Sequence, residues 1–151
     1  MEKRKILFIL FMSFILMVLV NSSISAVDFS VKNSYDKEET LIAKISGNFV
    51  DPVLKEDISF YKYYDGSEVG TAVEFDLLHI EGDYYIYAQL EKSEGNYSVK
   101  IEDVRYYEGA DVTDEAIVKG FKISNRTADF DVEPGAVKTT KDFSIEVQNL
   151  Q

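Results

Sequence analysis

The stretch EKSEGNYSVKI, from Glu91 to Ile101, places a glycine two residues before a tyrosine at the start of an alternating apolar run. Gly95 suits a sharp turn because it has no Cβ. Tyr97, Val99 and Ile101 fall on one face of an extended chain, because side chains alternate along a strand. The stretch therefore predicts a β-strand that begins at a tight corner and turns this face toward a core.

The same period of two continues through the chain after Ala26 and marks seven short apolar runs, punctuated by five Gly-containing turns. A constant-type immunoglobulin sandwich has about seven strands in about 100 residues. We therefore expect an all-β fold, an antiparallel sandwich with one core, over Val27–Ser124. The residues expected in this core are Phe29, Ile45, Phe60, Phe75, Ile86, Tyr97, Val99 and Ile101.

Two local patterns add to this expectation. In DISFYKYYDG the alternation places Ile58, Phe60 and Tyr64 on the inward face. The segment DVTDEAIVKG breaks the strand pattern, and Thr113 followed by acidic residues is typical of a helix N-terminus. A short helix of one or two turns is therefore expected there, in the loop before the last strand.

The corner stretch is similar to one in immunoglobulin-like sandwiches, where a tyrosine in the pattern D-x-[GA]-x-Y-x-C pins the start of the sixth strand. Gly95 and Tyr97 match this pattern, while Ser93 stands in place of Asp and Val99 in place of Cys. The chain thus resembles an immunoglobulin-like domain of prokaryotic (archaeal or bacterial) secreted or cell-surface proteins. The resemblance implies that the Tyr97 hydroxyl bonds backbone within Leu90–Glu94. With no cysteine and no tryptophan, the chain departs from the antibody-type pattern.

An internal repeat supports the same family type. The sequence DFSVKNS at Asp28 returns as DFDVEPG at Asp129, 101 residues later. With one residue inserted, the apolar positions of TLIAKIS then match those of DFSIEVQ, so that Ile45 corresponds to Val147. A period near 100 residues favours a tandem array of sandwiches. The predicted organisation is a sandwich at 27–124, a linker at 125–128, and the first strands of a second, truncated repeat at 129–151.

The N-terminus has the three parts of an export signal. Lys3, Arg4 and Lys5 precede an apolar run from Ile6 to Val20, and a small-residue stretch ends at Ala26. We expect a signal-peptide helix at 1–26 and a secreted or extracellular protein. If the segment stays uncleaved, it would anchor the protein, and no other membrane contact is expected. The net charge of −11 argues against nucleic acid as a partner.

Candidate sites are few. Asn96 and Asn125 begin N-x-[ST] sequons and are candidates for glycosylation. A set of four tyrosines would form a platform for sugar rings if they are exposed; otherwise they support the sheets. His79, the one histidine, has no companion ligands or nucleophile context and is expected to be an ordinary strand or loop residue. The four platform candidates are Tyr61, Tyr63, Tyr85 and Tyr87.

These features predict no catalytic residue, no metal and no cofactor, and therefore a protein that is not an enzyme. The leading hypothesis is an extracellular or cell-surface module, acting as a spacer, surface-layer or adhesion domain, with other surface proteins as partners. One alternative is a carbohydrate-binding module that uses the tyrosine face and takes polysaccharide as its partner. A second alternative is an accessory domain of a longer secreted hydrolase.

Overall fold

Strands make up most of the part of the chain that the computed structural model describes, namely residues 26–90, 93–133, 139 and 141–149. Among these residues there is no α-helix, and a single 3-10 turn, η1 (Lys55–Asp57), precedes the fourth strand. The predicted all-β fold class is thereby confirmed. The predicted signal-peptide helix lies outside the described residues except for Ala26, which directly precedes the first strand.

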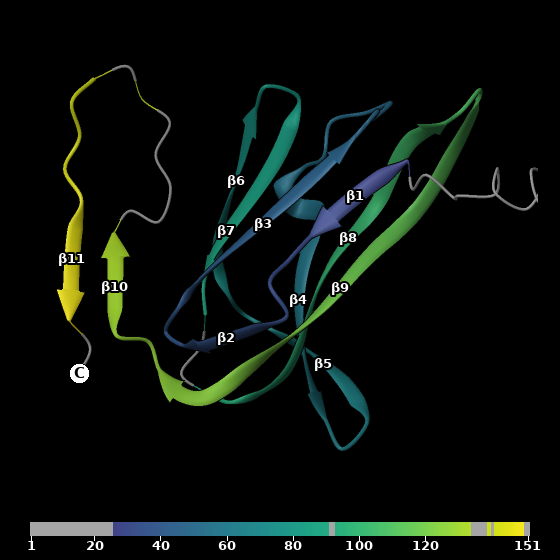
Figure 1. Cartoon of the computed structure of the whole chain (residues 1–151). Helices are drawn as coiled ribbons and strands as arrows, with labels where there is room; N and C mark the ends of the chain where they lie inside the picture. Colours follow the sequence, from purple (N-terminus) through teal and green to yellow (C-terminus); the bar gives the residue numbers. More distant parts are fainter. Residues whose placement is uncertain (1–25, 91–92, 134–138, 140, 150–151) are drawn as a thin grey trace, which may run out of the picture.

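One sheet has four antiparallel strands (Figure 1). Its spatial order is β1 (Val27–Ser30), β3 (Thr40–Gly47), β7 (Asp83–Gln89) and β6 (Glu74–Ile80). The register sets Phe29 opposite Ile45, and Ala43 opposite Ile86. All four are buried, so the apolar alternation read from the sequence becomes the inner face of this sheet.

The second sheet has five strands. Its spatial order is β2 (Ser34–Lys37), β9 (Asp111–Thr127), β8 (Gly95–Glu108), β4 (Ile58–Tyr64) and β5 (Ser67–Thr71). The sequence predicts an antiparallel sandwich, but β2 runs parallel to β9. The chain crosses between the sheets over residues 31–33, which brings β2 to the edge beside the last strand of the sandwich.

The two sheets enclose one apolar core, which confirms the predicted β-sandwich. Phe75 lies at the margin of this core and is only partly buried. The other residues predicted for the core are buried, and they are Phe29, Ile45, Phe60, Ile86, Tyr97, Val99 and Ile101.

The corner before β8 is held by the hydroxyl of Tyr97, within the backbone range that the sequence predicts. Tyr97 is 2% exposed, and its Oη donates to the carbonyl oxygen of Ser93 at 2.8 Å. The same Oη lies 2.8 Å from Ser93 Oγ, and Ser93 Oγ must be the donor there, because the phenol has one proton. Gly95 has a φ of 149°, and an added Cβ would lie 3.1 Å from Cε of Lys62. The corner therefore needs glycine.

The inward residue after Phe60 on β4 is Lys62, not the predicted Tyr64. Lys62 is 7% exposed, and its Nζ donates to Ser93 Oγ at 2.9 Å. The long aliphatic stem fills the interior while the ammonium reaches the polar corner. Burial lowers the pKa of Lys62, but hydrogen bonding to Tyr97 and Tyr64 outweighs it, and the pKa lies above its ordinary value. Tyr64 is 54% exposed, with its ring 4.9 Å from the same Nζ.

A long hairpin of β8 and β9 stands where the sequence predicts a short helix from Thr113, and that prediction is wrong. Thr113 pairs with Tyr106 across the hairpin, and Phe49 forms an isolated bridge with Tyr106 from the other side. The β-branched residues of this segment suit a strand, and pairing with β8 outweighs the local capping signal. Tyr106 is buried and donates to Glu115 Oε1 at 2.6 Å.

The end of β9 also occupies most of the predicted linker at 125–128, because the strand runs to Thr127. Asp36 of β2 accepts hydrogen bonds from Ser124 Oγ at 2.6 Å and from Arg126 Nη2 at 3.0 Å. The hydrogen bond from Ser124, and then the charge of Arg126, hold the pKa of Asp36 below its ordinary value. The polar residues that look like a linker therefore serve as partners for an edge strand.

Beyond the sandwich, β10 (Phe130–Glu133) and β11 (Glu146–Asn149) pair antiparallel as a separate two-stranded sheet (Figure 1). We call residues 129–149, where described, the tail. Four of its large apolar side chains are between 57% and 61% exposed, and they are Phe130, Phe143, Ile145 and Val147.

Replacing Tyr97 with Phe should lower the free energy of unfolding by about 1 kcal/mol or more, the usual effect of losing one buried hydrogen bond. Urea unfolding checks this. The matched control is Tyr63→Phe, whose side chain is 41% exposed on β4 and whose loss should change stability by less than about 0.5 kcal/mol. An unchanged midpoint and slope for Tyr97→Phe would show that the corner bond does not stabilise the fold.

The hydroxyl of Tyr106 should lose its proton only at an unusually high pH. Its hydrogen bond to Glu115, together with burial, raises the pKa of Tyr106 to about 12. Because the folded state holds the proton more tightly, this contact stabilises the fold fully below pH about 10 and loses its effect as pH rises through about 12. Difference absorbance between the native chain and Tyr106→Phe reports this ionisation. Glu115→Gln should move it toward pH 10, and an unmoved titration would contradict the assigned cause.

Candidate functional site: an apolar groove on one flank of the sandwich

The sandwich is incompletely closed where the chain crosses from β5 to β6. Strand β4 pairs with β5 only from Phe60, opposite Thr71, to Tyr64. The preceding residues, Ile58 and Ser59, pair with β8 on one side and have no partner in the β5 ladder on the other. The chain leaves the five-stranded sheet after Thr71 and begins β6 at Glu74. A gap in strand pairing therefore lies beside the core.

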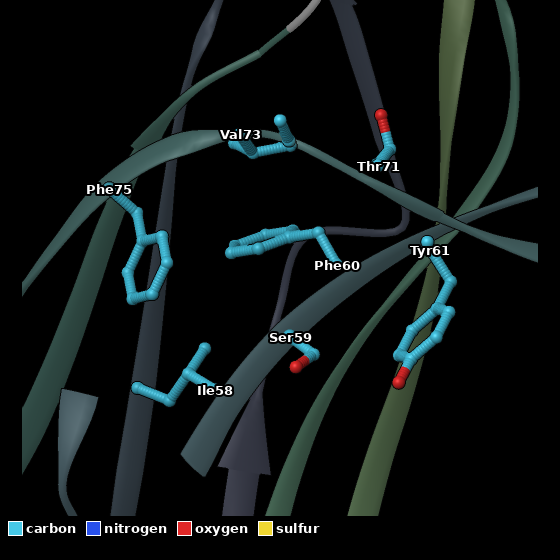
Figure 2. A pocket seen from close by; sticks show the side chains of 9 residues that line it. Ile58, Ser59, Phe60, Tyr61, Thr71, Val73 and Phe75 are labelled. Atoms are coloured by element: carbon cyan, nitrogen blue, oxygen red, sulfur yellow. The ribbon is translucent and has the colours of Figure 1, made fainter. Parts of the chain in front are cut away.

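This gap forms a groove of about 350 Å³, which we call the flank groove. Phe60 and Phe75 form its aromatic part, with ring centroids 5.4 Å apart. Figure 2 shows these two rings turned toward each other beneath Val73, while Tyr61 points away from them. The groove is lined by Ile58, Ser59, Phe60, Tyr61, Gly70, Thr71, Ala72, Val73 and Phe75.

The lining of the groove is mostly apolar. Its lining includes hydroxyl groups on Ser59, Tyr61 and Thr71, but no carboxylate, imidazole or amine. An apolar hollow with a few hydroxyl groups suits an apolar side chain or ring. Over the part of the chain that the structure describes, no group of His, Asp and Glu is arranged to hold a metal ion.

One charged pair borders the aromatic part. Lys55 Nζ lies 5.2 Å from the ring centroid of Phe75 and 3.2 Å from Asp76 Oδ1. A hydrogen bond from the backbone N–H of Leu77, and then the contact with Lys55, hold the pKa of Asp76 below its ordinary value. This exposed pair marks one border of the groove and leaves the apolar lining uncharged.

The four tyrosines predicted as a platform lie in different sheets. Tyr61 and Tyr63 are on β4 of the five-stranded sheet, and their neighbours Phe60 and Lys62 are buried. The other two, Tyr85 and Tyr87, are on β7 of the four-stranded sheet. Since the outer faces of a sandwich point in opposite directions, the four side chains do not form one surface.

The two candidate glycosylation residues lie close together. Asn96 and Asn125 are both exposed and line a second hollow of about 340 Å³, between the start of β8 and the end of β9. Asn125 Oδ1 accepts a hydrogen bond from Lys37 Nζ at 2.8 Å. Their use as glycosylation sites stays a prediction.

His79 lies in β6, opposite Tyr84 of β7. The two rings stack with centroids 4.4 Å apart and an angle of 10° between their planes. His79, which the sequence places in a strand or a loop, therefore lies in a strand.

The flank groove has no clear signature in the sequence. Its apolar residues look like ordinary core residues, and Phe75 was expected to be one of them. The available signal is the run of small residues at Gly70, Thr71 and Ala72, where β5 ends. Small residues leave the hollow open, but the run does not by itself say where β5 separates from β4.

Comparison of the chain with protein-family models finds no match, and comparison with curated proteins also finds none. Nowhere in the described residues is there a helix with the length and apolar character needed to cross a bilayer.

A label placed at Ala72 should sense the apolar groove. Because the chain has no cysteine, Ala72→Cys gives one attachment point for a fluorophore whose emission shifts to the blue in apolar surroundings. The matched control is Ser67→Cys at the exposed start of β5, the strand that ends just before Ala72. The Ala72 label should emit at the shorter wavelength, and equal emission from the two labels would contradict an accessible apolar groove.

Proposed function

We propose that this chain is a non-enzymatic module of an extracellular or cell-surface protein, built as an immunoglobulin-like sandwich of a tandem-repeat type. The observation that carries the proposal is the pairing in the tail. Phe29 corresponds to Phe130 in the sequence repeat, and Ile45 corresponds to Val147. The strands that contain them pair antiparallel in both places, as β1 with β3 and as β10 with β11.

The register of the two pairs differs by two residues. Phe29 lies opposite Ile45 in the sandwich, whereas Val132, not Phe130, lies opposite Val147 in the tail. A displacement of two residues keeps the same set of side chains on the same face of a strand, whereas a displacement of one would reverse the faces. The tail is thus consistent with the first two strands of a second sandwich.

The strand order supports the immunoglobulin-like type. The two sheets of the sandwich have nine strands, and if β2 and β5 are treated as additional edge strands, seven of the nine remain. In chain order, the first, second, fifth and fourth form one sheet, and the third, sixth and seventh form the other. This is the arrangement of the ABED and CFG sheets of the constant-type fold. The buried Tyr97 at the start of the sixth of these strands is a further point of agreement.

Export is the second part of the proposal. The first strand begins at Val27, one residue after the proposed cleavage position, so cleavage would remove no residue from the strands of the sandwich. Partners would then be other surface proteins. The carbohydrate-binding alternative loses support because its four tyrosines are divided between opposite faces. The accessory-domain alternative requires a catalytic domain elsewhere in a longer chain.

Surface labelling tests the proposal. Antibodies raised against the sandwich should bind intact cells of the source organism, and external protease should remove that signal. Signal seen only after lysis would overturn the surface location. A pull-down with cell-wall polysaccharide tests the alternative: retention that is lost in the Tyr85→Ala, Tyr87→Ala double variant would favour carbohydrate binding.

A further inference from the structure

The last strand of the sandwich has a long open edge. β9 pairs with β8 along one side, from Asp111 to Ile123. On its other side β2 pairs with it only between Lys122 and Thr127, and no described strand pairs with residues 111–121 there. Figure 1 shows β9, in green, continuing past β2 to the tip of the hairpin. This edge belongs to the sandwich itself, because β2 lies between it and the point where the chain leaves β9.

The main-chain groups that face the open edge follow from one hydrogen bond. The N–H of Lys122 donates to the carbonyl oxygen of Asn33 at 3.0 Å, on the side of β9 away from β8. Successive residues of a strand turn their main-chain groups to opposite sides. The register shift in the hairpin places Glu102 and Asp103 of β8 opposite one residue of β9, so the alternation along β9 is unbroken. The residues whose main-chain groups face the open edge are therefore Asp114, Ala116, Val118 and Gly120.

The side chains along the open edge combine apolar residues with charges of opposite sign. Ile117 packs against the core and is partly exposed, while Val118, on the opposite face of the strand, is 49% exposed. Glu115 and Lys119 lie on either side of Ile117 on its own face, and both are exposed. The hydrogen bond from Tyr106 to Oε1 of Glu115 holds this carboxylate in place. A strand with an acid and a base placed symmetrically about an apolar residue is complementary to a reversed copy of itself.

We propose that the open edge of β9 pairs antiparallel with the same edge of a second copy, across a two-fold axis at Ile117. Such a contact is isologous and closes at a dimer. The edge-facing residues then form hydrogen-bonded pairs, which add main-chain bonds between the two copies. The residues that lie opposite each other across the axis are Ile117 and Ile117, Glu115 and Lys119, Ala116 and Val118, and Asp114 and Gly120.

The charges select this register. An axis at Ile117 brings Glu115 of each copy opposite Lys119 of the other, and cross-strand pairs of opposite charge stabilise a sheet. An axis at Glu115 would set two carboxylates opposite each other. An axis at Ala116 or at Val118 would set Ile117 opposite a charged side chain. An axis between two residues would oppose main-chain groups that face the edge with groups that point away from it.

The length of the open edge suits a stable ladder. The paired segment ends at Phe121, because β2 occupies the edge from Lys122 onward. From Thr113 to Phe121 it spans about 30 Å, at about 3.4 Å per residue. The strongly acidic chain repels its own copies, so association is best measured at about 0.15 M salt or above, where charges are screened beyond about 8 Å. The pairing goes beyond the proposed function and does not depend on where the protein is located.

A single cysteine at the axis tests the register. The chain has no cysteine of its own. Residues of an antiparallel pair without hydrogen bonds have Cα atoms about 4.5 Å apart, within reach of a disulfide. Ile117→Cys should therefore form a disulfide-linked dimer under mild oxidation. The matched control is Lys119→Cys, at a more exposed residue. Its two copies would lie about 14 Å apart along the strands and should stay unlinked. Equal cross-linking of the two variants would indicate random collision and would overturn the contact.

Analytical ultracentrifugation of the chain from Val27 to Gln151, which contains every described strand, tests the charge pairs from about 10 μM to about 1 mM. The native chain should form a reversible dimer. Lys119→Glu and Glu115→Lys each set like charges opposite each other on both sides of the axis, so each variant alone should stay monomeric. Lys141→Glu makes the same change of charge on an exposed residue of the tail, and this matched control should dimerise like the native chain.

A mixture of the two charge-reversed variants gives the sharper result. When Lys119→Glu meets Glu115→Lys across the axis, both pairs again have opposite charges, so the mixture should form one-to-one dimers. A chain that fails to fold cannot restore the dimer, so the mixture separates repulsion from misfolding. A native chain that is monomeric throughout would overturn the contact. So would a charge-reversed variant that dimerises alone, a mixture that stays monomeric, or a control that loses association. None of these results bears on surface labelling of cells, so failure of the contact is distinguishable from failure of the proposed function.

Discussion

The hydrogen bond from Tyr97 to the carbonyl of Ser93 is the constraint on which the five-stranded sheet depends. It fixes the turn that starts β8, and β8 pairs with β4 on one side and with β9 on the other. Lys62 reaches the same corner from β4 and donates to the same serine. A cysteine-free sandwich has no covalent link between its strands, so this polar corner, at the margin of the apolar core, sets the position of the central strand.

Much of the fold can be predicted from the sequence, because apolar and polar residues alternate along a strand that is buried on one face. Phe29, Ile45 and Ile86 are placed correctly from period two alone. The errors occur where a local signal competes with pairing. Thr113 and the acidic residues after it look like a helix start, but they lie in a segment that pairs along β8. Lys62 would be assigned to the surface by its charge, yet it is buried because its ammonium finds the corner.

The candidate site was less predictable for a different reason. The flank groove depends on where β5 separates from β4, and this is a property of two strands together. Phe60 is correctly predicted to be a core residue, but the residues next to it in the sequence do not indicate that one side of its ring borders a hollow. The four-tyrosine platform has the same difficulty. Tyr61 and Tyr85 both lie in alternating tyrosine-rich runs of the sequence, and only the strand order shows that they belong to different sheets.

The parallel pairing of β2 with β9 has a mechanical consequence. The chain enters β2 at Ser34, at one end of this ladder, and leaves β9 at the other end, beyond Thr127. Tension applied to the two ends would draw β2 and β9 in opposite directions along their common axis. The ladder, with the contact between Asp36 and Arg126, would be loaded in shear, so its bonds would share the force and would not open one at a time. A strand that looks like a minor addition to the edge is therefore the element placed to resist pulling.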